Sequence, residues 1–268
     1  MKLVWLTDIH LNFLDENARA TFYQTITSSN DDAVLITGDI AEAPSLLFLL
    51  KEMQTAVKKP IYFVLGNHDY YRSHVDKIHN DMITLTQANF SLYWLPASGA
   101  QMLQPDIYLV GQDGWADGRL GDYYNSTVEM TDGYVIADLL PAKMLGKQAL
   151  LEKMQALADH DALGLKRDLD NALQKNAKKI IVATHIPPFK ENCLHQGHMS
   201  VDTFIPFLSS KATGDVLLQA AQSAPHVEFL MLCGHVHSDS IYQPLPNLTV
   251  RSGKAEYYHP KINDIINL

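Results

Sequence analysis

The sequence predicts an α/β protein with a largely parallel sheet. Short apolar runs rich in Val, Ile and Leu are typical of buried strands, and they occupy residues 3–7, 33–37, 61–65, 107–110, 180–184 and 229–233. Helical patterns separate several of these runs, and such alternation implies crossover connections between parallel strands. With 268 residues, 47% of them apolar, the chain can bury a large core. We expect one domain over residues 1–268.

The helices are predicted from apolar residues that recur every three or four positions. One such stripe lies between the second and third predicted strands and consists of Leu46, Leu49, Leu50, Met53 and Val57. The same spacing recurs at residues 150–158 and again at residues 165–173. Each stripe would turn one face of a helix toward the core.

One segment departs from this alternation. From Gly111 to Gly133 the chain contains five Gly and four Asp without a clear period. Long ordered loops in compact domains are often functional, so we predict a substrate-facing insertion around residues 111–175. A surface excursion without a function explains the composition equally well.

Charge, cysteine content and hydropathy indicate which partners and which compartment the protein could have. Against 30 Asp and Glu there are 21 Lys and Arg, a net charge of −9 that disfavours extended nucleic-acid binding. Cys193 and Cys233 form no disulfide framework and fit a reducing compartment. No stretch approaches the ~20 apolar residues of a membrane span. We expect a cytoplasmic protein that acts on a small molecule, and the oligomeric state stays open.

Reactive side chains follow five of the predicted strands. In chain order they are Asp8 and His10, then Asp39, then Asn67, His68 and Asp69, then His185, and finally His235 and His237. Singly, each could be a helix cap, a turn residue or a core histidine. Ligand sites in open α/β sheets gather beyond the carboxyl ends of the strands, so five equivalent positions favour a common site.

The residue types at these positions are those of a metal site. Carboxylate, carboxamide and imidazole together suit Mn, Fe, Zn, Ni or Co better than an all-oxygen calcium site or a thiolate zinc site. In Asp8-x-His10 and His235-x-His237, alternate residues of an extended segment project to the same side. Each pair could therefore reach one ion.

The five blocks together resemble the calcineurin-like metallophosphoesterases. The matching blocks are D-x-H at residues 8–10, G-D-x-x-E at 38–42, G-N-H-D at 66–69, the lone His185, and G-H-x-H at 234–237. This resemblance covers nearly the whole chain and implies two mixed β-sheets packed as a sandwich and flanked by helices. Residues 241–242, 248–250 and 257–258 would then supply the last antiparallel strands.

The resemblance also implies a role for each site residue. Asp8, His10 and His237 would hold one divalent transition-metal ion, and Asn67, His185 and His235 a second, with Asp39 bridging the two ions. Two such ions can activate a water as hydroxide and neutralise phosphoryl oxygens. His68 would lie near the leaving-group oxygen, with Asp69 orienting its ring.

The substrate is less defined than the reaction. Candidate contacts are Arg72, Arg119, Trp115 and His195, although a surface or core role is the commoner fate of such residues. The blocks depart from those of protein Ser/Thr phosphatases, and the acidic chain has no obvious DNA-binding region. We predict a bacterial-type phosphoesterase that acts on a small-molecule or nucleotide phosphodiester. The alternatives are a phosphomonoesterase and a metal-dependent protein-binding module without turnover.

Overall fold

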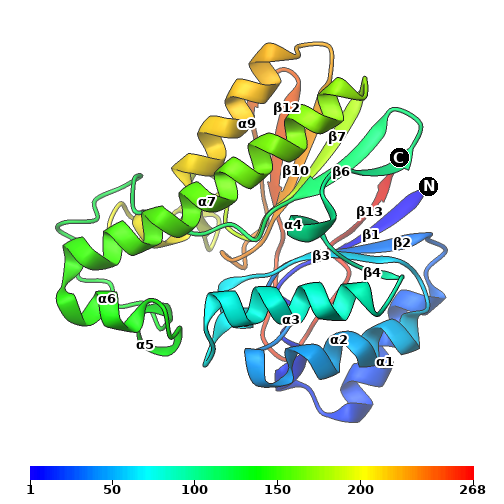
Figure 1. Cartoon of the computed structure of the whole chain (residues 1–268), viewed down its shortest axis with the longest axis horizontal. Helices are drawn as coiled ribbons and strands as arrows, with labels where there is room; N and C mark the ends of the chain where they lie inside the picture. Colours follow the sequence, from blue (N-terminus) through cyan, green and yellow to red (C-terminus); the bar gives the residue numbers. More distant parts are fainter.

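Two large β-sheets pack face to face between layers of helices (Figure 1). The computed structural model describes residues 1–268. The strand order is β13-β1-β2-β3-β4 in the first sheet and β11-β12-β10-β7-β6-β5 in the second. This architecture confirms the predicted two-sheet α/β sandwich.

The first sheet contains the first three predicted strands. Its members are β1 (Lys2–Leu6), β2 (Ala33–Thr37), β3 (Ile61–Val64), β4 (Leu92–Trp94) and β13 (Asp264–Asn267). Strands β1 to β4 are parallel, and β13 runs antiparallel to β1. The outer face packs against α1 (Glu16–Ser28), α2 (Ala43–Val57) and α3 (Val75–Gln87), which form one 32-residue core cluster with it. The predicted stripe of α2 is buried there.

The second sheet contains the other three predicted strands. Its members are β5 (Gln101–Gln104), β6 (Ile107–Gly111), β7 (Lys179–Ala183), β10 (Glu228–Cys233), β11 (Ser240–Leu245) and β12 (Leu248–Ser252). Helices α7 (Lys147–Gln174) and α9 (Lys211–Ser223) cover its outer face (Figure 1). The two helical patterns predicted at residues 150–158 and 165–173 form the single helix α7, because buried residues such as Ala158 and Ala162 continue the stripe between them.

A third cluster of 11 buried residues lies between the sheets and includes Trp5, Leu35, Leu109, Ile181 and Leu232. Strands buried on both faces need apolar side chains at almost every position, which explains their continuous apolar runs. The sandwich therefore holds the carboxyl ends of β1, β2, β3, β7 and β10 close to one another.

Shorter elements complete the chain. They are η1 (Leu11–Phe13), η2 (Asn67–Tyr70), α4 (Leu95–Ser98), α5 (Asp132–Val135), α6 (Leu140–Leu145), η3 (Lys190–Asn192), β8 (Leu194–His195), β9 (His198–Met199) and α8 (Ile205–Leu208). The Gly-rich segment is irregular up to α5, and whether residues 111–175 face a substrate stays a prediction. Helix length and hydropathy give no candidate for a membrane span.

The prediction of antiparallel strands at residues 241–242, 248–250 and 257–258 is partly wrong. Strand β12 runs parallel to β10, whereas β11 and β13 are antiparallel to their neighbours. Tyr257 and Tyr258 lie in a turn instead of a strand, and Tyr258 has a left-handed φ of 68°. The irregular residues 253–263 carry the chain from the second sheet back to the first, so this stretch cannot pair with either edge.

Candidate metal centre

The candidate ligands lie on loops that leave the carboxyl ends of strands from both sheets. Asp8 follows β1, Asp39 follows β2 and Asn67 begins η2 after β3. His185 follows β7, while His235 and His237 follow β10. The structure thus brings together all seven predicted ligand positions at one edge of the sandwich, in two adjoining clusters.

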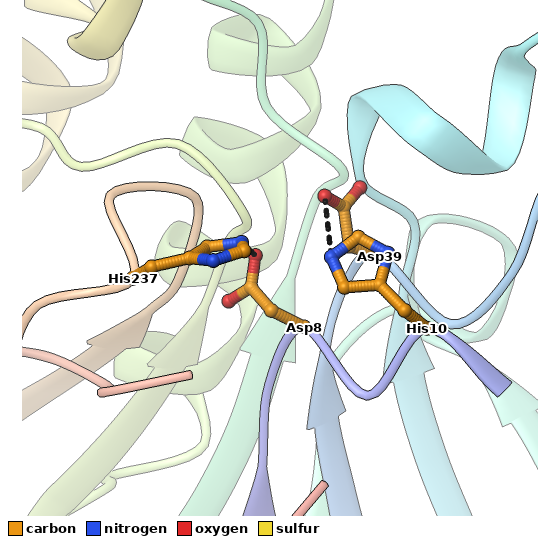
Figure 2. A group of neighbouring side chains, drawn as sticks. All are labelled: Asp8, His10, Asp39 and His237. Atoms are coloured by element: carbon orange, nitrogen blue, oxygen red, sulfur yellow. Dashed lines mark ion pairs between the residues drawn. The ribbon is translucent and has the colours of Figure 1, made fainter. Parts of the chain in front are cut away.

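The first cluster consists of Asp8, His10, Asp39 and His237, each of which offers one ligand atom within 4.8 Å of the others (Figure 2). His237 Nε2 lies 3.3 Å from Asp8 Oδ1, and His10 Nε2 lies 3.7 Å from Asp39 Oδ2. Both ring nitrogens of His10 are buried without a hydrogen-bond partner. Buried polar atoms are normally satisfied, so an imidazole with two free nitrogens indicates a binding position.

The second cluster is centred on the carboxamide oxygen of Asn67. Asn67 Oδ1 lies 3.0 Å from His185 Nε2 and 3.1 Å from His235 Nδ1. Asp39 Oδ1 lies 3.4 Å from His185 Nε2, while its Oδ2 faces His10 in the first cluster. The carboxylate of Asp39 therefore stands between the two clusters, as a bridging ligand would.

Hydrogen bonds on the far sides of the rings orient both histidines of the second cluster. His185 Nδ1 lies 3.0 Å from the carbonyl oxygen of Thr37, and His235 Nε2 lies 3.1 Å from that of Phe207. A carbonyl oxygen only accepts, so these nitrogens carry the protons of the neutral rings. The lone pairs of the opposite nitrogens then point at Asn67 Oδ1, which is itself an acceptor. Such an arrangement is repulsive unless a cation lies between the atoms.

Burial lowers the pKa values of His10, His185 and His235 and favours their neutral forms. Burial acts in the same direction on His237, but its hydrogen bond with Asp8 and the charge of Asp8 raise the pKa of His237 above the ordinary value. Desolvation lowers the pKa of His10 to about 3 and, with the neighbouring His185, that of His235 to about 4. Burial, with Asp8 and Asp69 close by, raises the pKa of Asp39 well above its ordinary value. Burial acts in the same direction on Asp8, but His237 and the other imidazoles hold the pKa of Asp8 below its usual range. The seven candidate ligands thus combine carboxylate, carboxamide and imidazole donors without any Lys or Arg, and this donor set fits divalent metal ions.

Five of the candidate ligands have left-handed backbone conformations that side chains other than Gly rarely adopt. Their φ angles are 49° at Asp8, 39° at His10, 51° at Asp39, 70° at His235 and 53° at His237. Interlocking backbone hydrogen bonds hold this geometry, since the N–H of Asp8 donates to the Gly38 carbonyl and the N–H of His10 to the Asp39 carbonyl. Strain of this kind is characteristic of functional sites.

Glycines beside the ligands are required by close backbone approach. A Cβ at Gly66 would lie 2.5 Å from the Asp39 nitrogen and 2.8 Å from the His185 ring. At Gly234 a Cβ would overlap Asp8 and Thr7. The Gly of the G-N-H-D and G-H-x-H blocks therefore keeps the two sheet edges close together.

His68 lies beside the first cluster. Its Nε2 is 3.9 Å from Asp39 Oδ2, and its ring stacks on Tyr71 with centroids 4.2 Å apart. The His68 ring also meets the edge of His10 at 4.8 Å. Burial, and next to it the charge of His235, lowers the pKa of His68 to about 4. The side chain is thus close to the centre and free to contact a bound group.

The structure does not show the expected contact of Asp69 with the His68 ring, and a catalytic role of Asp69 stays a prediction. Its carboxylate accepts hydrogen bonds from the backbone N–H groups of Ile40, Ala41 and Gly66 and makes none with the His68 ring. Those N–H groups belong to loops that follow β2 and β3, so Asp69 ties these loops together. Because its oxygens bond to these backbone groups, Asp69 leaves the buried Nδ1 of His68 without a hydrogen-bond partner.

The four predicted substrate contacts occupy different surroundings. The Arg72 guanidinium lies 2.6 Å from Glu42, and that of Arg119 pairs with Asp159 at 2.7 Å and with Asp117. Trp115 is buried against Tyr70 and also lines a small cavity beside Asn67. His195 lines a groove that reaches His235. A contact between any of the four and a substrate stays a prediction.

Two side chains near the centre were not predicted from the sequence as site residues. Tyr257 packs on His10 and His237 with ring centroids 4.6 and 4.9 Å apart, and burial raises the pKa of Tyr257 to about 12. Asp132, in the Gly-rich segment, accepts from Asn67 Nδ2 at 2.9 Å and thereby aims Oδ1 of Asn67 at the histidines. The sequence analysis did note Tyr257 and Tyr258, but it predicted a strand there instead of a contact with the site. No spacing rule singled out Asp132.

Fold and site together define a two-sheet α/β protein with a candidate metal centre at one sheet edge. The sequence of residues 1–239 matches the family described as calcineurin-like phosphoesterase. This match covers most of the chain, and the chain belongs to that family. No curated protein sequence matches the chain significantly.

Solved structures share the fold at low sequence identity. A phosphopantetheinyl hydrolase from Mycobacterium tuberculosis superposes with a TM-score of 0.65 at 15% identity, over 96% of this chain and 89% of that one. A dimetal phosphatase from Danio rerio gives a TM-score of 0.60 at 11% identity, over 95% and 87% of the two chains. At such identities the likeness establishes the fold alone.

Proposed function

We propose that this protein hydrolyses a small-molecule phosphoester, with a phosphodiester favoured over a monoester, at a centre of two divalent metal ions. The observation that carries the proposal is the position of Asp39, whose two carboxylate oxygens face two separate groups of candidate ligands. Membership of the calcineurin-like phosphoesterase family supports the reaction class.

The proposed ligands of one ion are Asp8, His10 and His237, and those of the other are Asn67, His185 and His235, with Asp39 shared. Such a pair of ions, when bound, lowers the pKa of a water between them and offsets the charge of phosphoryl oxygens. Mixed nitrogen and oxygen donors suit Mn, Fe, Zn, Ni or Co. The ligand set does not select among these metals.

The chain's own residues supply orientation and hydrogen bonding. The carbonyl groups of Thr37 and Phe207 fix the rings of His185 and His235, so their ligand nitrogens are presented without rearrangement. We assign to His68 the donation of an N–H hydrogen bond to the leaving-group oxygen, where negative charge develops. Its ring is held for this role by stacking on Tyr71 rather than by Asp69.

Charge near the centre favours a diester. A phosphomonoester carries more negative charge than a diester, and Arg side chains usually match that charge. The two Arg residues predicted to do so are already paired, Arg72 with Glu42 and Arg119 with Asp159 and Asp117. Compared with a monoester, a diester needs fewer cationic side chains to match its charge and more space for its second organic group.

The test is hydrolysis of bis-p-nitrophenyl phosphate beside p-nitrophenyl phosphate. The protein is stripped with a chelator, reloaded with Mn, Fe, Zn, Ni or Co in turn, and assayed for bound metal as well as turnover. We expect two ions per chain and metal-dependent release of nitrophenolate, faster from the diester. His235→Ala should lose both metal and turnover, whereas His226→Ala, which alters an exposed histidine, should keep both.

Faster release from the monoester would reverse the diester assignment. Two bound ions without turnover of either substrate would contradict the proposed hydrolysis and favour a metal-dependent binding protein.

A further inference from the structure

A groove of about 570 Å³ opens beside the metal centre, on the side of His235. Its wall is formed by the β8–β9 hairpin and by the residues that lead into α8. The apolar side chains that line it are Met130, Leu194, Met199, Val201, Phe204 and Leu208. This volume is in the range of pockets that hold small organic ligands.

The groove is apolar yet open to solvent. Met199 is 50% exposed, Val201 63% and Phe204 45%, so three large apolar side chains gather on one small surface. Isolated exposed apolar residues are normal, but a contiguous group beside a site marks a binding surface. The base of the hairpin is closed, because the N–H of Ser200 donates to the carbonyl of Cys193 at 2.8 Å.

The groove contains no Lys or Arg side chain that could pair with an additional phosphate. Besides the six apolar residues of its wall and the apolar Val236, its lining consists of His195, Gln196, His198, Ser200 and His235, without any Lys, Arg, Asp or Glu. A nucleoside polyphosphate would place additional negative charge here and find no guanidinium or ammonium to pair with it. For an uncharged organic group, the desolvation penalty of entering the groove would be small.

The groove is continuous with the proposed metal centre through one residue. His235 lines the groove, and its Nδ1 lies 3.1 Å from Asn67 Oδ1 in the second ligand cluster. Phe207, whose carbonyl holds the far side of the His235 ring, lies between Phe204 and Leu208 of the groove wall. A phosphoryl group at the centre would therefore have its ester substituent directed along an apolar surface.

We propose that this groove binds an apolar alkyl or aromatic group esterified to the substrate phosphate, so that the enzyme selects lipophilic phosphoesters over nucleotides. The proposal rests on the function proposed above for the same centre. His195, the last residue of β8, contributes to the wall of the groove, in line with its prediction as a substrate contact.

The test measures binding, so that it does not depend on turnover. Isothermal titration calorimetry compares methylphosphonate with hexylphosphonate on the metal-loaded protein, since both probes carry the same charged head group. Each fully buried methylene tightens binding roughly fourfold, and five partly buried ones should give at least about tenfold tighter binding of hexylphosphonate.

Variants locate the effect. The double variant Met199→Ser with Val201→Ser should bind methylphosphonate like the wild type but lose most of the preference for hexylphosphonate. The matched control is Phe90→Ser, which removes a 91% exposed apolar side chain outside the groove and should leave the preference unchanged. Both variants alter exposed positions, so the fold should tolerate them.

Equal affinities for the two phosphonates would overturn the proposal, even if p-nitrophenyl esters are hydrolysed. A hexyl preference that survives in the double variant would also overturn it, because the chain would then lie elsewhere. If metal-dependent hydrolysis fails while the groove-dependent preference is observed, the proposed function falls and the apolar binding site stands.

Discussion

Replacing Asp39 by Asn should make the protein more stable than wild type without metal and less stable than wild type with metal. Asp39 is 1% exposed, and its carboxylate lies near Asp8 and Asp69 without a protein cation beside it. Asn has nearly the same shape and keeps an oxygen that can accept the hydrogen bond from the His68 N–H at 2.9 Å. The substitution therefore removes one charge and creates no cavity.

Without metal, the variant should be the more stable protein at neutral pH. The folded pKa of Asp39 is raised above the ordinary 3.8, chiefly by burial. A group with a raised folded pKa contributes stability that is complete below the unfolded pKa and is lost as pH rises through the folded pKa. At pH 7 the unfolded chain is free to ionise this group while burial opposes its ionisation in the folded state, so the carboxyl group of Asp39 disfavours folding and Asn does not.

With metal, the order should reverse. A metal present at about 100 times its Kd stabilises the folded state by about 2.7 kcal/mol per site. If the lost bridging charge weakens binding about a hundredfold, the same concentration contributes only about 0.4 kcal/mol, a loss of roughly 2.3 kcal/mol. For a chain of this size that corresponds to a fall in Tm of roughly 5–9 °C relative to loaded wild type.

The assay is thermal unfolding of both proteins with chelator and with each metal, beside direct measurement of bound metal. Asp161→Asn is the matched control, because Asp161 is another buried carboxylate with a raised pKa but lies on α7, where its Oδ2 accepts from Gly114. It should keep the full stabilisation by metal. An Asp39→Asn protein stabilised by metal as much as wild type would refute the bridging assignment.

Four further outcomes follow from the geometry. His68→Ala should bind metal normally but hydrolyse esters with poor leaving groups about a hundredfold or more slowly, and equal rates on such esters would remove its assigned role. Tyr257→Ala should weaken metal binding severalfold by freeing the His10 ring, while Tyr257→Phe, which keeps the ring contacts, should not; calorimetry with the metal distinguishes the two. Gly66→Ala should lose metal and Tm together, since a Cβ there meets the Asp39 backbone; a normally loaded variant contradicts this. Burial and Asp113 raise the folded pKa of Asp161 to about 8, so the stability advantage of Asp161→Asn over wild type should grow from pH 4 to pH 8; denaturant titrations that show a constant difference would be inconsistent with that shift.

The predicted ligands converge for a reason that can be read from the sequence. Parallel strands place their carboxyl ends at the same edge, so Asp8, Asp39 and Asn67 had to lie near one another once β1, β2 and β3 were recognised. The apolar runs predicted those strands because both faces of each are buried. The second sheet brought His185 and His235 to the same edge, and only the resemblance to a known family anticipated that sheet.

Other features depend on contacts that local sequence does not encode. Whether the Asp69 carboxylate turns toward an imidazole or toward backbone N–H groups depends on the loop after β2, some 28 residues earlier in the chain. Tyr257 reaches His10 only because the tail must cross from β12 back to β1 before pairing as β13. Asp132 and Asn67 are 65 residues apart. In each case the two partners are far apart in the chain, so no short pattern could predict their contact.

Several features of the ligand centre would oppose folding in the absence of bound metal. The left-handed backbone at Asp8, His10 and Asp39, the unsatisfied nitrogens of His10 and the buried carboxylates all raise the free energy of the folded state. A cation between these groups would satisfy the nitrogens and offset the negative charge without any change in the backbone. The sheets therefore supply the stability that holds the ligands in place, and binding of metal recovers part of what that geometry costs. For this reason stability, as well as turnover, should report on occupation of the centre.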